Sequence, residues 1–212
     1  MSKGNRAAAL RAQGDLTGAR DLQEQVLAVR RRLLGEEHPN TLTSMGNLAG
    51  TLWAQGDLAG ARSLQERVLA ARRRLLGDDH PDTLASMNSL AGTLSAQGDL
   101  AGARDLQEEV LAARRRLLGG EHPTTLGSMN SLAATLLDQG DLAGARDLQE
   151  RVLAACRRLL GAEQRLDLCG FGALDLDAYR RARLPPSRVA ARGRAVPADA
   201  RRSSKTRSVS LR

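Results

Sequence analysis

The tetrapeptide Gln-Gly-Asp-Leu occurs four times in this 212-residue chain, and successive copies lie 42 residues apart. The copies begin at Gln13, Gln55, Gln97 and Gln139. The units that begin at Gly35, Gly77 and Gly119 agree with their neighbours at 33 of 42 positions. A fixed period of about 20–50 residues is typical of a solenoid, in which each unit packs only on its neighbours. We therefore predict one quasi-linear array over residues 1–161.

Each unit contains signals for two helices, as the unit 77–118 illustrates. Pro81 suits a first helical turn, where its missing N–H would have no partner. Gly98 ends the first helix, because glycine adopts a left-handed cap at little cost. Asp99 is a suitable N-cap for the second helix. The unit is therefore predicted to be a helical hairpin with its corner at Gln-Gly-Asp.

Apolar residues recur at helical spacing along both predicted helices. The stripe of the first helix consists of Leu84, Met87, Leu90, Ala91 and Leu94. The stripe of the second helix consists of Leu100, Ala103, Leu106, Val110, Leu111 and Leu117. One hairpin cannot bury both stripes, so the hairpins must stack. Ala91 and Ala103 are small, which lets two helices approach closely.

The repeat sets the expected domain boundaries. A partial first repeat covers 1–34, and the complete units are 35–76, 77–118 and 119–161. Residues 162–184 could form a segment that caps the last hairpin, and 185–212 are predicted to be a disordered basic tail. The short first unit fits a polar end cap or a clipped start equally well. The tail could also be an out-of-frame artefact, because the repeat stops abruptly.

Charge is divided unevenly between the array and the tail. Residues 1–161 hold 20 basic and 19 acidic side chains, and 162–212 hold 12 and 5. The runs Arg30–Arg32, Arg72–Arg74 and Arg114–Arg116 could form a nucleic-acid patch. We favour a self-neutralising ladder, because acids follow each run in the linker. Nucleic-acid binding is then expected only through the tail, and weakly.

The remaining composition indicates the compartment. Cys156 and Cys169 have neither a disulfide framework nor metal-ligand spacing, which favours a reducing compartment. The N-terminus lacks an apolar run of signal-peptide length. No stretch has the roughly 18 apolar residues of a membrane span. We expect a cytoplasmic protein without a membrane span.

The repeated motifs also carry a family resemblance. Asn47-Leu48-Ala49, Gln55-Gly56-Asp57-Leu58 and His80-Pro81 resemble a tetratricopeptide repeat, and the long second helix resembles the kinesin-light-chain type. The resemblance implies an all-α fold, a right-handed α-solenoid of stacked helical hairpins. It also implies that the first helices line a concave groove that receives peptide segments of partner proteins.

The residues that would line this groove lie on the first helices, off the apolar stripe. They are Asn47, Asn88 and Asn130, with Ser89, Ser131 and the single tryptophan, Trp53. Amide side chains can donate to and accept from an extended backbone, and an exposed tryptophan is a good anchor. The alternatives are that the polar residues are only solvated and that Trp53 packs on the next hairpin.

The three histidines occupy one equivalent position in each linker: His38, His80 and His122. Stacked helices lie on the order of 10 Å apart, so these residues cannot share a metal ion within one chain. A structural role at the helix start is predicted instead. No nucleophile accompanies them, so we expect no enzymatic activity, no cofactor and no metal.

These observations favour a non-enzymatic protein-interaction scaffold that binds a protein or peptide partner. The chain could be a fragment of a larger bacterial signalling protein. Two alternatives remain. Exposed repeat ends could drive self-association into a homo-oligomer, or the basic tail could bind nucleic acid or an anionic surface.

Overall fold

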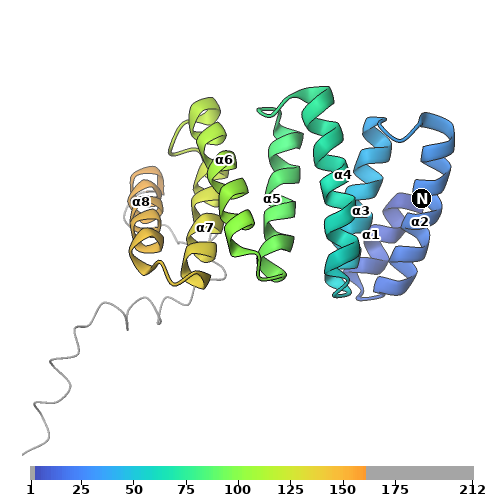
Figure 1. Cartoon of the computed structure of the whole chain (residues 1–212), viewed down its shortest axis with the longest axis horizontal. Coiled ribbons are helices and arrows are strands. Elements are labelled where there is room, and N and C mark those ends of the chain that lie inside the picture. The colour runs from blue at the N-terminus through green and yellow to red at the C-terminus, as the bar shows by residue number, and fades with distance from the viewer. Residues whose placement is uncertain (1–2, 161–212) are drawn as a thin grey trace, which may run out of the picture. The chain divides into compact units, whose positions relative to one another are not determined.

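The computed structural model of the protein describes residues 3–160, and every regular element in this range is a helix (Figure 1). In chain order the helices are α1 (Lys3–Ala12), α2 (Leu16–Leu34), α3 (Pro39–Ala54), α4 (Leu58–Leu76), α5 (Pro81–Ala96), α6 (Leu100–Leu118), α7 (Pro123–Asp138) and α8 (Leu142–Leu160). The predicted cap at 162–184 and the predicted tail at 185–212 lie outside the described residues.

Each helix packs against the next one along the chain, so the hairpins α1–α2, α3–α4, α5–α6 and α7–α8 stack in order (Figure 1). Contacts between α2 and α3, α4 and α5, and α6 and α7 join successive hairpins. This arrangement confirms the predicted all-α solenoid of stacked helical hairpins.

The corner of each hairpin has the geometry that its sequence predicts. Gly98 adopts a φ of 84°, a left-handed conformation that favours glycine. The chain then turns back, and the Asp99 N–H donates to the Leu94 carbonyl oxygen at 2.9 Å. Asp99 is the N-cap of α6, and its carboxylate accepts from the Gly102 N–H at 3.0 Å. The tetrapeptide is therefore the corner of the hairpin.

The linker between hairpins is organised by a histidine. His80 is the N-cap of α5, and its Nδ1 accepts from the Asp82 N–H at 3.1 Å. Pro81 follows in the first turn of α5. His38 and His122 cap α3 and α7 in the same way. The predicted role of the histidines at helix starts is confirmed.

The core lies within and between the hairpins and consists mainly of leucine, methionine and alanine side chains. Met87 and the pair Ala91 and Ala103 are completely buried. The alanine pairs of the neighbouring units are equally buried: Ala49 with Ala61, and Ala133 with Ala145. Small residues at these positions allow the two helices of a hairpin to pack closely, as predicted.

One apolar residue assigned to the core was placed wrongly. Leu117 is 49 % exposed and does not belong to the buried stripe of α6. α6 has 19 residues and α5 has 16. The two helices meet at the Gln-Gly-Asp corner, so the extra residues of α6 extend past the far end of α5. Leu117 lies in this overhang.

Cys156 lies buried on α8. Cys169, the other cysteine of the chain, lies outside the described residues. Within the part of the chain that the structure describes, no helix has the length and apolarity that crossing a membrane requires.

Candidate functional site

The first helices of the three complete hairpins carry almost no charge. α3 contains no charged residue, α5 contains only Asp82 and α7 contains only Asp138. Both acids lie at helix ends. The second helices, by contrast, contain many arginines and acids that form ion pairs. The exposed side of α3, α5 and α7 is therefore an uncharged surface beside a highly charged one.

The six predicted site residues lie on this uncharged side. Asn47 and Ser89 are exposed, whereas Asn88, Asn130 and Ser131 are half-buried. Trp53 is 48 % exposed, so part of its side chain is accessible. We call the six residues together the first-helix stripe. They occupy three equivalent positions: Asn47, Ser89 and Ser131 at one, Asn88 and Asn130 at the second, and Trp53 at the third.

The serine hydroxyls of the stripe are already used as donors. Ser89 Oγ donates to the Ala85 carbonyl oxygen at 3.0 Å, and Ser131 Oγ donates to the Gly127 carbonyl oxygen at 3.2 Å. Each hydroxyl therefore bonds to its own helix and offers mainly its lone pairs to a ligand. Asparagine amides are the better candidates for donating to a partner backbone.

Several positions on α3, α5 and α7 are glycines, which add no side chain to the surface of these helices. At Gly46, Gly92 and Gly127 a Cβ atom would have no heavy-atom neighbour within 4 Å. At Gly50 it would lie 3.1 Å from Arg11 Nη1. These positions are not required to be glycine by close packing, except that Gly50 accommodates the Arg11 side chain.

A polar hollow lies at the N-terminal end of this surface, between α1, α2 and α3. Its lining includes Arg11, Gln23, Arg30, Ser44 and Asn47. Gln23 is buried, and its Oε1 has no hydrogen-bond partner. Sequence reasoning did not identify this hollow. The signal was available, because Gln65 and Gln107 repeat the same glutamine in later units and are also buried.

The three arginines of each run make different contacts. The first member joins successive hairpins: Arg114 Nη1 donates to Ser128 Oγ at 2.7 Å. Arg30 and Arg72 make the same bond to Ser44 and Ser86. Burial lowers the pKa of Arg114 from its usual value.

The second and third members mostly pair with acids. Arg73 Nη2 lies 3.0 Å from Glu109 Oε2, and Arg73 Nε lies 3.1 Å from Asp78 Oδ1. Arg158 Nη2 lies 2.6 Å from Glu121 Oε1. The equivalent pairs in the earlier units are Arg74 with Glu37 and Arg116 with Asp79. The ion-pair ladder predicted from the linker acids is therefore present, and most of these arginines have an acidic partner.

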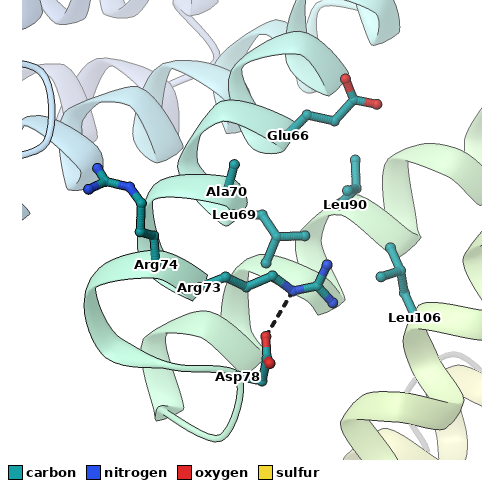
Figure 2. A pocket seen from close by; sticks show the side chains of 8 residues that line it. All are labelled: Glu66, Leu69, Ala70, Arg73, Arg74, Asp78, Leu90 and Leu106. Atoms are coloured by element: carbon teal, nitrogen blue, oxygen red, sulfur yellow. Dashed lines mark ion pairs between the residues drawn. The ribbon is translucent and has the colours of Figure 1, made fainter.

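A second hollow lies beside this ladder, between α4, α5 and α6 (Figure 2). Leu69, Leu90 and Leu106 form its apolar part. Figure 2 shows Arg73 extending over these leucines toward Asp78. The hollow is thus bordered by the inter-repeat ion pairs and not by the first-helix stripe.

A metal site is not evident. Between residues 3 and 160 there is no group of three histidine, cysteine or acidic side chains arranged to hold a metal ion. The three histidines each cap a separate helix.

Comparison with known families identifies the array. The sequence model of the tetratricopeptide repeat matches residues 1–73, 46–116 and 90–158, and these matches together cover most of the chain. The chain belongs to the tetratricopeptide repeat family. Tetratricopeptide repeats generally mediate protein–protein interactions. No match was found among curated proteins.

Solved structures show which type of tetratricopeptide array this is. The nearly identical TPR-like repeats assigned to a kinesin light chain of Podosopora anserina are 33% identical to this chain, with a TM-score of 0.71. The match covers 76% of this chain and 77% of that one. BtubC (BKLC) from P. vanneervenii is 20% identical with a TM-score of 0.69, over 77% of this chain and 65% of that one, and shows the fold alone. The repeats are therefore kinesin-light-chain-like, a class of repeat found typically in non-enzymatic scaffolds.

Proposed function

We propose that this tetratricopeptide array is a non-enzymatic scaffold that binds an extended peptide segment of a partner protein along the first-helix stripe. The observation that carries the proposal is the distribution of charge on the first helices. α3 has no charged residue, and the single charged residue of α5 and of α7 lies at a helix end. Most charged side chains of the second helices have an ion-pair partner within the array, whereas this side offers amides, hydroxyls and an exposed indole.

The chemistry of the stripe suits a peptide backbone. Asn47, Asn88 and Asn130 each carry an amide that can both donate and accept. Gly92 leaves space beside Ser89 into which a backbone can approach. Trp53 supplies a large apolar surface at low entropic cost. A charged partner side chain would find no oppositely charged residue along the middle of α5 and α7, so we expect the segment bound there to be mostly uncharged.

The open glycine at 92 allows a sharp test. Peptides selected from a random library on the full chain would be titrated while the fluorescence of Trp53 is recorded. Gly92→Arg should weaken their binding at least roughly tenfold, because a long charged side chain would block an uncharged surface without contacting its own fold. Ala101→Arg, an equivalent change at an exposed position on α6, should leave binding unchanged.

A second pair of substitutions tests the amides. Replacing Asn88 and Asn130 together by leucine should abolish peptide capture while the helical circular dichroism signal and melting temperature stay close to those of the wild type. Unchanged affinity in the double variant or in Gly92→Arg would show that the peptide binds elsewhere.

Self-association is a second candidate, because the last hairpin has no following repeat. Leu142 is 67 % exposed, whereas its equivalents Leu58 and Leu100 are half-buried. An array that pairs through this end should show a molar mass that rises with concentration in light scattering. Leu142→Asp should return it to a monomer, and a monomer at all concentrations in the wild type would exclude this candidate.

A further inference from the structure

One carboxylate bridges two arginines where the hairpins that contain α2 and α4 meet. Arg31 Nε, on α2, lies 3.4 Å from Glu36 Oε1. Arg67 Nη2, on α4, donates to Glu36 Oε2 at 2.6 Å. The two oxygens of Glu36 therefore neutralise two guanidinium groups from successive second helices. We call this arrangement the Glu36 bridge.

The same two arginines recur two periods later without the carboxylate. The positions of Arg31 and Arg67 are occupied by Arg115 and Arg151, and the position of Glu36 is occupied by Gly120. α6 carries Arg115 and α8 carries Arg151. The third repeat therefore retains both cations of the Glu36 bridge and lacks its anion.

At the joint between α4 and α6, the equivalent arginine is neutralised by different carboxylates. There Arg73 pairs with Asp78 at 3.1 Å, as Figure 2 shows, and with Glu109 at 3.0 Å. Glu109 stands at the position of Arg67 and Arg151. In the two earlier joints, Arg31 and Arg73 each form an ion pair with at least one carboxylate. At the joint between α6 and α8, the equivalent residue Arg115 forms no ion pair with a described carboxylate.

The side chain of Arg115 has no ion pair among the described residues, whereas Arg31 lies 3.4 Å from Glu36. The Nε and Nη2 atoms of both arginines are buried and have no hydrogen-bond partner, so the difference between the two joints is the carboxylate. Burial, and then the charge of Arg151, lower the pKa of Arg115, and Asp147 opposes this only in part. Arg151 itself has only a long contact of 3.6 Å to Asp147. Since a guanidinium remains charged in proteins, the pair favours any anion that can reach it.

The place of the missing carboxylate is open. Gly120 is exposed, and a Cβ atom there would have no heavy atom within 4 Å. The backbone of Gly120 is not in the left-handed region, so glycine is not required for its conformation. At Gly120, no atom of the described chain therefore fills the place from which the Glu36 side chain extends in the first joint.

We propose that Arg115 and Arg151 form a binding site for the carboxylate of an acidic side chain on a partner peptide, which takes the place of the Glu36 carboxylate. The two oxygens would each accept from one guanidinium, the geometry that favours arginine in carboxylate recognition. The site lies on the second helices α6 and α8, and does not use the first-helix stripe. Its test is therefore independent of the function proposed above.

The experiment follows the arginine Nε–Hε signals of the full ¹⁵N-labelled chain by nuclear magnetic resonance. The probe is a blocked tetrapeptide with two central glutamates, and its control has glutamines instead. The acidic peptide should shift the signals of Arg115 and Arg151 saturably, with a dissociation constant in the roughly millimolar range expected for a single ion pair at a partly exposed site. The glutamine peptide should shift neither signal.

Two variants supply the missing anion from within the chain. Gly120→Glu recreates the Glu36 bridge, and Arg151→Glu recreates the pair of Arg73 with Glu109. Each should raise the melting temperature and weaken the acidic peptide roughly tenfold or more, since a charged hydrogen bond is lost to the ligand. Gly127→Glu, at another exposed and open glycine, adds the same charge and should leave the binding of the acidic peptide unchanged.

Three results would overturn the proposal. The first is the absence of a saturable shift at Arg115 and Arg151 in the wild type. The second is equal binding by wild type and Gly120→Glu. The third is that acetate, at the same carboxylate concentration, binds as tightly as the peptide, which would leave a site for free anions and no recognition of a partner.

Discussion

Asp57 and Gly60 are related by a hydrogen bond that leaves no room for a side chain on the glycine. The Gly60 N–H donates to Asp57 Oδ1 at 2.9 Å. A Cβ atom on Gly60 would lie 2.5 Å from Asp57 Oδ2. The glycine two residues after each Gln-Gly-Asp-Leu is therefore explained by the cap, and not by a need for backbone freedom.

Gly60→Ala should accordingly differ from an alanine substitution on the open surface. The new methyl group would displace the capping carboxylate and so remove most of the gain in helix propensity. Gly92→Ala has no such conflict and should stabilise the array by about 0.5–1 kcal/mol. Urea unfolding followed by circular dichroism should place Gly60→Ala about 1–2 kcal/mol below Gly92→Ala. Equal stability of the two variants would contradict the steric argument.

Neighbouring arginines of one run should differ in their contribution to stability. Arg114 is half-buried and donates to Ser128 across the joint between α6 and α7. Arg114→Gln should destabilise the array by about 1–2 kcal/mol. Arg116 is exposed and pairs with Asp79 on the surface, so Arg116→Gln should cost less than about 1 kcal/mol. The comparison uses thermal melting at one salt concentration, and the reverse order would refute the division of roles within the run.

The histidine caps predict a specific rescue. His80→Ala removes the acceptor for the Asp82 N–H and should destabilise by about 1 kcal/mol. Asparagine is a favoured N-cap, so His80→Asn should restore most of this loss. Chemical denaturation of the two variants checks the prediction. If asparagine is as destabilising as alanine, the imidazole acts through something other than capping.

The two largest apolar side chains of successive first helices should also behave differently. Met87 is completely buried, and Met87→Ala should cost about 2–4 kcal/mol because it leaves a cavity. Trp53 is 48 % exposed, so Trp53→Ser, which matches Ser95 of the next unit, should cost less than about 1.5 kcal/mol. The free energies of unfolding decide this, and a large loss at Trp53 would show that it packs as a core residue.

Most of the fold could be read from the chain because the repeat encodes it locally. Pro81, Gly98 and Asp99 act on the backbone within a few residues of themselves, so their roles follow from the order of residues alone. The periodic stripe likewise identified Met87 and Ala91 as buried. Leu117 was misplaced because periodicity describes which side of a helix is apolar, and not how far the neighbouring helix extends.

The candidate site was predictable only in part. The register of the repeat places Asn47, Ser89 and Ser131 on one line, but it does not show that the two hydroxyls bond to their own helices. The buried Gln23 and the hollow beside it were missed, since a polar residue at a helix position gives no indication of what faces it.

The order of the residues determines the corners, the caps and the stacking of hairpins, because these depend on hydrogen bonds and apolar periodicity between near neighbours in the chain. The partners of Arg114, Arg115 and Arg116 are decided only by the packing of one hairpin on the next. Consecutive residues of a helix point in different directions, about 100° apart, so three identical arginines meet a serine, no partner and an aspartate. The serine lies 14 residues from Arg114, on α7, and the aspartate 37 residues from Arg116, in the linker before α5.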